Sequence, residues 1–372
     1  MKECLKIVQF AKEQFVLTIA IIAMMITCFF VPVDAQYWSY FNWRTLATLF
    51  CTLAVVAAFS HIYVFEILSK NIVLKLHNLR NATLGLVFIT FFGSMLLAND
   101  MALLTFLPLG FYVLNSTGHK QAMAFTFIMQ NIAANLGGMV TPFGNPQNLY
   151  LYAHYQINTL EFIKIMLPSF IAATILILIV CCFVKPVPLE LKNDIDYTLD
   201  KKKTIIYSIL FICSILIVFR IIPYLLGTIV ITLILYKMDK KAIKEVNYPL
   251  LATFCVFFVF SGNMARIPAV NDFFTQVLPI NTLLIGILSC QLISNVPSAV
   301  LLSHFTSDYH NLLPAVNIGG CGTLIASLAS LITFSEFKKH NPDKVKRYMV
   351  QFTAINLIFI IVLYFVQVII AP

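Results

Sequence analysis

The sequence predicts an all-α polytopic membrane protein with an inverted-topology repeat, two re-entrant helical hairpins and two broken transmembrane helices. Three observations predict this fold: long uncharged windows, basic residues confined to short stretches, and polar motifs that recur in the same order in both halves. The chain of 372 residues is 60% hydrophobic and only 11% charged, whereas soluble domains carry about 25% charged residues. Uncharged windows such as 45–65 and 165–184 have the length that crosses a bilayer core as a helix. Backbone in lipid must satisfy its own hydrogen bonds, so repeated windows of this kind predict a helical bundle.

The positions of the basic residues predict how the helices are oriented. All 25 Lys and Arg except Arg44, Lys164, Arg220 and Arg266 fall in six short stretches. These stretches are 1–14, 69–80, 119–120, 185–203, 237–247 and 338–347. Because basic loops lie on the cytoplasmic side of most membranes, we expect a cell-membrane protein with its N-terminus in the cytoplasm and its C-terminus outside. The formal net charge of +9 is then mainly a topology signal, and we expect no nucleic-acid partner.

Placing all six stretches on one side determines the path of the chain. Two apolar segments, 81–118 and 280–307, must then each enter and leave the membrane on a single face. Each is interrupted midway, by Asn99-Asp100 in the first and by Ser294-Asn295-Val296-Pro297 in the second. We therefore expect one re-entrant hairpin from the inside and one from the outside. The expected crossings are 15–31, 45–68, 121–156, 159–184, 204–219, 224–236, 250–266, 311–337 and 348–370.

The two halves contain matching motifs in the same order. Asn42–Thr48 resembles Asn247–Thr253, and Leu136–Thr141 resembles Ile318–Thr323. The remaining matched pairs are Asn99 with Asn295, Gly144 with Ala326, Asn145 with Ser327 and Asn148 with Ser330. Each match is weak alone, and their shared order carries the prediction of a repeat.

The repeat predicts the domain organisation. The first repeat is expected at 15–184, with a hairpin at 81–118 and a broken helix at 121–156. The second is expected at 220–372, with a hairpin at 280–307 and a broken helix at 311–337. Residues 185–219 form the linker and the helix that inverts the second half. The first apolar run also has a signal-peptide interpretation, but the repeat needs this run as its first helix.

Inverted repeats with paired broken helices are typical of secondary transporters, which bind substrate and coupling ion near the membrane midplane. The first predicted site joins the tip of hairpin 81–118 to the break in helix 121–156. Two prolines and a glycine within residues 141–148 cannot continue a regular helix, and Asn and Thr supply neutral oxygen ligands and donors. The alternative is a proline kink with capping Asn residues. The residues of this first site are Asn99, Asp100, Gly138, Thr141, Gly144, Asn145 and Asn148.

Asp100 stands in the middle of an apolar segment. An acid at membrane depth is costly, which makes it a functional candidate. It could carry a coupling proton or bind Na⁺, and it could instead only cap a hairpin helix.

The second predicted site joins the tip of hairpin 280–307 to the break in helix 311–337. It contains no acid. The glycines near it could also serve close helix packing, although the Asn and Pro at the hairpin tip argue against packing alone. The residues of this second site are Ser294, Asn295, Thr323, Ala326, Ser327 and Ser330.

The sequence predicts no cofactor and no transition-metal site. The nine cysteines form no CxxC pair, and we expect them to be buried small hydrophobic residues. The histidines have no metal-ligand spacing.

These motifs resemble the ion transporter superfamily, which includes arsenite permeases, sodium/proton antiporters of the NhaD kind, citrate permeases and divalent anion/sodium symporters. Ala98-Asn99-Asp100 is similar to the arsenite-permease-like branch and aligns with the Ser-Asn-Thr hairpin tip of the symporters. The run from Asn131 to Gly138, followed by Thr141–Asn148, resembles the most specific signature of the superfamily. Ser294–Pro297 and Thr323–Leu331 resemble its counterparts in the second half.

The resemblance covers roughly 42–370 and implies Na⁺ or H⁺ at each hairpin tip, an anion between the tips, and an elevator-type motion of the domain that carries them. Ala98 and Val296 replace side chains that the symporters' tips supply, and Asp100 replaces a Thr. These departures leave proton coupling open. One early helix of the symporters also has no counterpart here, which leaves open whether their homodimer carries over to this chain.

The resulting hypothesis is a cation-coupled transporter, using Na⁺ or H⁺, of a small anion such as a di- or tricarboxylate. The alternatives are a Na⁺/H⁺ antiporter or an arsenite/H⁺ antiporter, and more distantly a channel or a non-transporting receptor. An intramembrane enzyme would need a nucleophile with a base, or metal ligands, at one depth, and the sequence suggests neither. The expected partners are the small anionic substrate and the lipid bilayer.

Overall fold

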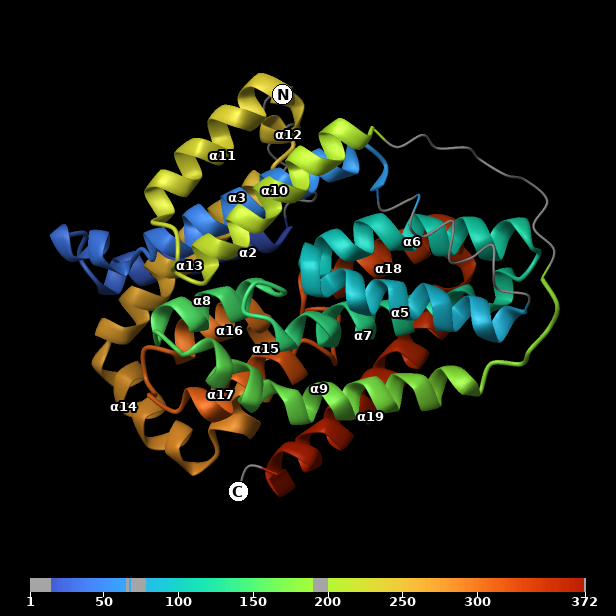
Figure 1. Ribbon diagram of the computed structural model, residues 1–372. Coiled ribbons are helices and arrows are strands. Elements are labelled where there is room, and N and C mark those ends of the chain that lie inside the picture. Colours follow the sequence, from blue (N-terminus) through green and yellow to red (C-terminus); the bar gives the residue numbers. More distant parts are fainter. Residues whose placement is uncertain (1–14, 65–66, 68–77, 190–199, 371–372) are drawn as a thin grey trace, which may run out of the picture.

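The computed structural model describes residues 15–64, 67, 78–189 and 200–370, and all its named elements are helices (Figure 1). The only β-type pairing among the described residues is an isolated bridge between Asn78 and Pro188. Predictions placed on residues 1–14, 65–66, 68–77, 190–199 and 371–372, including the end of the expected crossing 45–68, lie outside the described residues. These cover the first basic stretch, most of the second and part of the linker.

The first half begins with two helices and continues with a tightly packed group. Its helices are α2 (Phe15–Phe30), η1 (Ala35–Tyr40), α3 (Trp43–Ser60), α5 (Leu79–Leu97), α6 (Asn99–Ser116), η2 (Lys120–Ala122), α7 (Met123–Gly137), η3 (Gly138–Val140), α8 (Pro146–His154) and α9 (Thr159–Cys182).

The second half also consists of long and short helices. Its elements are α10 (Lys201–Val218), α11 (Tyr224–Met238), α12 (Lys240–Lys244), α13 (Tyr248–Arg266), α14 (Pro268–Val277), η4 (Leu278–Ile280), α15 (Thr282–Ile293), α16 (Asn295–Leu302), α17 (Tyr309–Ile318), α18 (Leu328–His340), η5 (Pro342–Lys344) and α19 (Val345–Ile370).

Asparagine side chains begin several of these helices. Asn42 and Asn247, which the sequence comparison aligned, cap α3 and α13 by accepting from the backbone N–H of Thr45 and Leu250. Such caps satisfy backbone donors that have no partner in the first turn of a helix. Each of the two aligned motifs therefore begins a helix.

Six helical stretches of the described chain are long and apolar enough to cross a membrane. They are Trp43–Ser60, Leu79–Leu97, Lys120–Val140, Thr159–Cys182, Lys240–Arg266 and Pro342–Ile370. The shorter apolar helices are Leu17–Phe30, Tyr224–Met238 and Thr282–Ile293. The all-helical membrane architecture predicted from the sequence is confirmed.

The helices form two groups (Figure 1). The small group consists of α2, α3 and α10–α13, in which α3 packs on α10 and α11, and α2 packs on α13. The large group consists of α5–α9 and α15–α19, and α7 lies at its centre against α5, α6, α18 and α9. The groups meet where α13 packs on α16 and where α3 packs on α8.

The structure differs from the expected spans in a few places. α3 ends at Ser60, whereas the expected span ran to 68, because the chain turns at 61–63 and Tyr63 adopts a left-handed conformation with φ 55°. The short helices η1, α12 and α14 were not expected. The break in 311–337 is longer than one kink, since α17 ends at Ile318 and α18 starts at Leu328.

Candidate functional site

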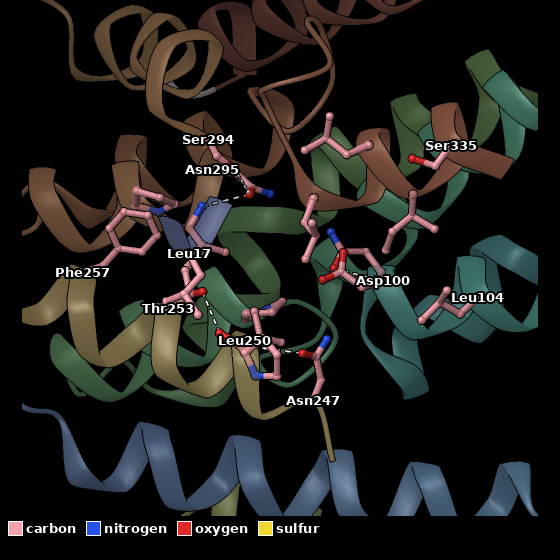
Figure 2. Close-up of a pocket in the computed structure, with 18 of the residues that line it drawn as sticks. Leu17, Asp100, Leu104, Asn247, Leu250, Thr253, Phe257, Ser294, Asn295 and Ser335 are labelled. Carbon is pink, nitrogen blue, oxygen red and sulfur yellow. Dashed lines mark hydrogen bonds between the residues drawn. The ribbon is translucent and has the colours of Figure 1, made fainter. Parts of the chain in front are cut away.

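A cavity of about 540 Å³ lies between the two groups of helices (Figure 2). Asp100 faces it from α6, Ser294 and Asn295 from the junction of α15 and α16, and Thr253 from α13. Its other lining residues are Leu17, Asn99, Leu104, Pro146, Asn247, Pro249, Leu250, Phe257, Val296, Pro297, Leu328, Leu331, Ile332, Phe334, Ser335 and Glu336. The tips of both predicted hairpins therefore face one cavity.

The first tip is the junction of α5 and α6 at Ala98, which has φ 64° although it is not glycine. The side-chain oxygen of Asn99 accepts from the N–H of Asp100 at 3.0 Å, and its Nδ2 donates to Asn135 Oδ1 at 3.0 Å. Asp100 lies in the first turn of α6 and is 5% exposed, and its Oδ1 has no hydrogen-bond partner among the described residues. The positive end of the helix dipole favours a negative charge there, but a buried carboxylate without a partner is costly.

The second tip repeats this geometry at the junction of α15 and α16. Ser294 has φ 76°, and Asn295 Oδ1 accepts from the N–H of Val296 at 2.9 Å. The backbone N–H of Asn295 donates to Ala326 O at 2.9 Å, and Ser294 Oγ lies 3.3 Å from the same oxygen. Asn295 Nδ2 is buried and has no partner in the described chain.

The break after α7 is held by asparagine amides. Asn148 Nδ2 lies within hydrogen-bond distance of three backbone oxygens, at 3.2 Å from Gly138, 3.1 Å from Met139 and 3.3 Å from Thr141. Thr141 Oγ1 donates to the backbone of Met95 in α5 at 3.3 Å. These bonds satisfy carbonyls that the end of a helix leaves free.

Gly138 and Gly144 allow this loop to fold tightly. A Cβ on Gly138 would meet the side chain of Asn145 and the backbone oxygen of Gly144, and a Cβ on Gly144 would meet the backbone oxygen of Gly138. Both glycines therefore shape the site through their small size and do not contribute ligands from a side chain.

The break before α18 is held mainly by serines. Ser327 caps α18 by accepting from the N–H of Ser330, and the two hydroxyls lie 3.0 Å apart. Ser330 Oγ also accepts from Asn131 Nδ2 of α7 at 3.3 Å. Thr323 is exposed, and both its backbone N–H and its hydroxyl donate to Gln291 of α15, at 2.8 Å and 3.2 Å.

The predicted site residues thus divide into two sets. Asn99, Asp100, Ser294 and Asn295 line the cavity. The others lie behind these tips and hold the two breaks in place, except that the backbone oxygen of Ala326 contacts the second tip directly. These supporting residues are Gly138, Thr141, Gly144, Asn145, Asn148, Thr323, Ala326, Ser327 and Ser330.

Sequence reasoning did not include Asn135 and Asn317 in either site. Both are fully or almost fully buried and hydrogen-bond to residues of the first site. Each stands two residues before the first glycine of an aligned Gly-Gly pair, so extending the alignment by one residue would have found them. Asn247 and Thr253 of α13 also line the cavity, although the sequence comparison treated them only as repeat markers.

The charge of the cavity lining is unusual for an anion site. Among the described residues that line it, Asp100 and Glu336 are the carboxyl groups, and none is Lys, Arg or His. No group of three or more His, Cys, Asp or Glu side chains in the described part of the chain has the arrangement of a metal site. The ligands available to a cation are two carboxylates, neutral amide oxygens and hydroxyls, which suit a hard cation such as Na⁺ or a proton on Asp100.

Comparison with known proteins supports a transport role for this arrangement. The family described as "Citrate transporter" matches residues 7–311. The uncharacterized transporter MJ0456 of Methanocaldococcus jannaschii is 34% identical over 294 residues, which cover 78% of this chain and 80% of that protein. The inner membrane protein YbiR of Escherichia coli K12 is 27% identical over 311 residues, which cover 82% of each chain.

Proposed function

This chain belongs to the citrate transporter family, and from that premise we propose that it is a cation-coupled secondary active transporter of a small anion such as a di- or tricarboxylate. It is a multi-pass membrane protein of a transporter family. The observation that carries the proposal is the single cavity faced by both tips, each formed by an asparagine with a left-handed residue before it.

The charge of the cavity gives a physical reason for coupling. An anion entering beside an ionised Asp100 would meet a like charge on a side chain that is only 5% exposed, where solvent screens Coulomb repulsion less than at an open surface. A Na⁺ ion or a proton bound at Asp100 would remove that repulsion. Binding of the cation would therefore favour binding of the anion, which is the thermodynamic basis of symport.

We further propose that the α5–α6 and α15–α16 pairs are the re-entrant hairpins of an inverted repeat. The support is the left-handed residue at each junction, Ala98 and Ser294, and the matching hydrogen bond made by Asn99 and Asn295. The large group would move against the small group in an elevator-type motion. The basic stretches support a cytoplasmic N-terminus and an outside C-terminus.

A second candidate is a proton-driven antiporter of Na⁺ or arsenite. The observation that favours it is the presence of two carboxyl groups, and no basic group, among the lining residues that the structure describes. Such a lining suits a cation or a neutral solute without further compensation.

The first test is the melting temperature of the detergent-purified protein against a panel of anions, each in NaCl and in choline chloride at several pH values. A ligand that binds the folded state stabilises it by about 2.7 kcal/mol at 100 times its Kd. We expect one class of carboxylate to raise the melting temperature, more strongly with Na⁺ or at lower pH. Asn99→Ala and Asn295→Ala should abolish this rise, whereas Asn271→Ala, an exposed position on α14, should preserve it.

Stabilisation by Na⁺ or arsenite without any carboxylate would favour the antiporter. A protein that responds to no anion, no Na⁺ and no change of pH would contradict both candidates.

A further inference from the structure

Asn317 lies in the last turn of α17, in the second half of the chain, and is completely buried. Its Nδ2 donates to Leu313 O at 2.8 Å and to Asn148 Oδ1 at 2.6 Å. Its Oδ1 accepts from Asn145 Nδ2 at 3.1 Å and from Gln147 Nε2 at 3.3 Å. Every donor and acceptor of this side chain is therefore in use.

The backbone oxygen of Leu313 determines which way the Asn317 amide faces. A backbone oxygen can only accept, so it must face the NH₂ end of Asn317. The oxygen end then faces Asn145 and Gln147 and requires that both present their NH₂ groups to it.

The orientation of these two amides determines what they can offer to a ligand. Asn145 uses its second N–H on Asn135 O at 3.0 Å, so both of its donors are occupied. Its Oδ1 and the Oε1 of Gln147 are buried and have no partner in the described chain. Two buried oxygens without partners, in a break that carries predicted cation ligands, are free to accept a cation or a proton donor.

We propose that Asn317 is a positioning residue that orients the amide of Gln147 and, together with the backbone oxygen of Asn135, that of Asn145, so that their oxygens are available to the coupling cation at the first site. This inference rests on the proposed function, which supplies the cation. Through Asn317 the second half of the chain orients groups of the first half, so the affinity of the first site depends on the packing of α17.

The test compares Asn317→Ala with a matched control, Asn356→Ala. Asn356 is also completely buried, accepts from the N–H of Gly322 at 3.2 Å and donates to Phe352 O at 2.8 Å, and these partners within the described chain lie outside residues 141–148. Each purified variant is titrated with NaCl at constant ionic strength in choline chloride, and separately with pH, while its melting temperature is followed. If a substitution lowers the melting temperature measured without added cation but leaves the half-saturating cation concentration unchanged, the replaced residue has only a structural role.

We expect Asn317→Ala to raise the half-saturating cation concentration about tenfold or more, the size of effect seen when a partner that orients a metal ligand is removed. Asn356→Ala should leave that concentration close to the wild-type value. Asn317→Thr, which keeps a small polar side chain but cannot serve both amides, should behave like Asn317→Ala and provides the test if the alanine variant does not fold. When Asn317→Ala is added to a protein that carries both Asn145→Ala and Gln147→Ala, the loss should be no greater than in that protein alone, because Asn317 acts through these two amides.

The outcomes separate the inference from the proposed function. A wild-type protein without any cation response would overturn the proposed function and the inference together. A wild-type response that persists unchanged in the Asn317 variants, or a loss that simply adds to that of Asn145→Ala with Gln147→Ala, would overturn the inference alone.

Discussion

At the scale of single residues, the two hairpin tips share the same local backbone geometry. A left-handed residue turns the chain at Ala98 and at Ser294, and the following asparagine accepts from the next backbone N–H. Non-glycine residues with positive φ are uncommon and concentrate where function requires a particular turn. The tips differ in Asp100, whose carboxyl group has no counterpart at the second tip.

The role of Asp100 can be tested by removing the charge of its side chain while keeping the shape. We expect Asp100→Asn to abolish the dependence of substrate uptake on the cation gradient in proteoliposomes, because the neutral amide repels no anion and cannot carry a proton. Asp100→Glu should retain part of this dependence. Glu161→Gln is the control, since Glu161 lies in α9 and hydrogen-bonds Tyr309 outside the cavity. Concentrative uptake by Asp100→Asn at the wild-type level would show that Asp100 only caps α6.

At the scale of elements, α7 places the polar groups of the site. Every residue from Thr126 to Met139 is buried, so Asn131 and Asn135 can reach both breaks from within the large group. α7 approaches α5 closely because Gly137 has no side chain. A Cβ at that position would contact the backbone oxygen of Phe91 and Ser94 Oγ.

Gly137→Ala should therefore force α5 and α7 apart. Overpacking of this kind typically costs about 1–3 kcal/mol, and we expect a lower melting temperature together with weaker ligand binding. Gly93→Ala is the matched control, because its Cβ would meet only the ring of Phe106, a side chain that can move. Equal effects of the two substitutions in a thermal unfolding experiment would contradict this account.

The small group contains a titratable side chain, His61, directly after the end of α3. His61 Nδ1 lies 2.7 Å from Asp239 Oδ2, and His61 Nε2 lies 2.6 Å from Glu245 Oε2, so the ring joins α3 to both ends of α12. Burial alone would lower the pKa of His61, but the hydrogen bonds to Glu245 and Asp239 outweigh it and raise the pKa above its ordinary value. The imidazolium form is therefore favoured in the folded protein.

This pair of contacts predicts how stability depends on pH. A histidine with a raised pKa in the folded state contributes stability that is complete below its unfolded value of about 6.5 and is lost as pH rises through the folded-state pKa. We expect the melting temperature of the wild type to fall, relative to that of His61→Gln, as the pH is raised through the folded-state pKa of His61. A difference between the two proteins that does not change with pH would refute the prediction. His310→Gln, which alters an exposed histidine near Glu161 on the large group, serves as control.

At the scale of the whole molecule, the corner between α10 and α11 touches the large group. Arg220, at φ 64°, donates from Nη2 to Tyr152 O at 2.7 Å and lies over the Tyr152 ring at 4.9 Å. Phe219 packs edge-on against Phe143 of the broken helix, with ring centroids 6.0 Å apart. An elevator-type motion of the large group would have to break these contacts.

A crosslink across this corner should therefore stop transport. We expect Phe143→Cys with Phe219→Cys, in a background without native cysteines, to lose uptake when treated with a bifunctional thiol reagent. Tyr155→Cys with Tyr309→Cys is the control, because both residues belong to the large group and their ring centroids lie 5.3 Å apart. Full activity of the crosslinked first pair, measured in proteoliposomes, would rule out relative motion at this corner.

The sequence predicted most helices to within a few residues, because uncharged length and breaking residues are local properties. Hairpin 81–118 corresponds to α5 and α6 with their junction at Ala98, and the break expected at 141–148 begins where η3 ends. Membership in the ion transporter superfamily, read from the same motifs, is confirmed by the family match. Topology orientation and the repeat stay predictions.

What the sequence by itself determined was the membrane class, the helix pattern and the two tips, since hydropathy and helix-breaking residues act over a few neighbouring positions. Only the tertiary structure decided that Asn99, Asp100, Ser294 and Asn295 face one cavity, and that Thr323 does not. It also decided the role of Asn317, whose partners Asn145 and Asn148 lie about 170 positions away along the chain. The physical reason is that the orientation of a buried amide side chain depends on all of its hydrogen-bond partners at once. Only tertiary packing brings together partners that are so far apart along the chain.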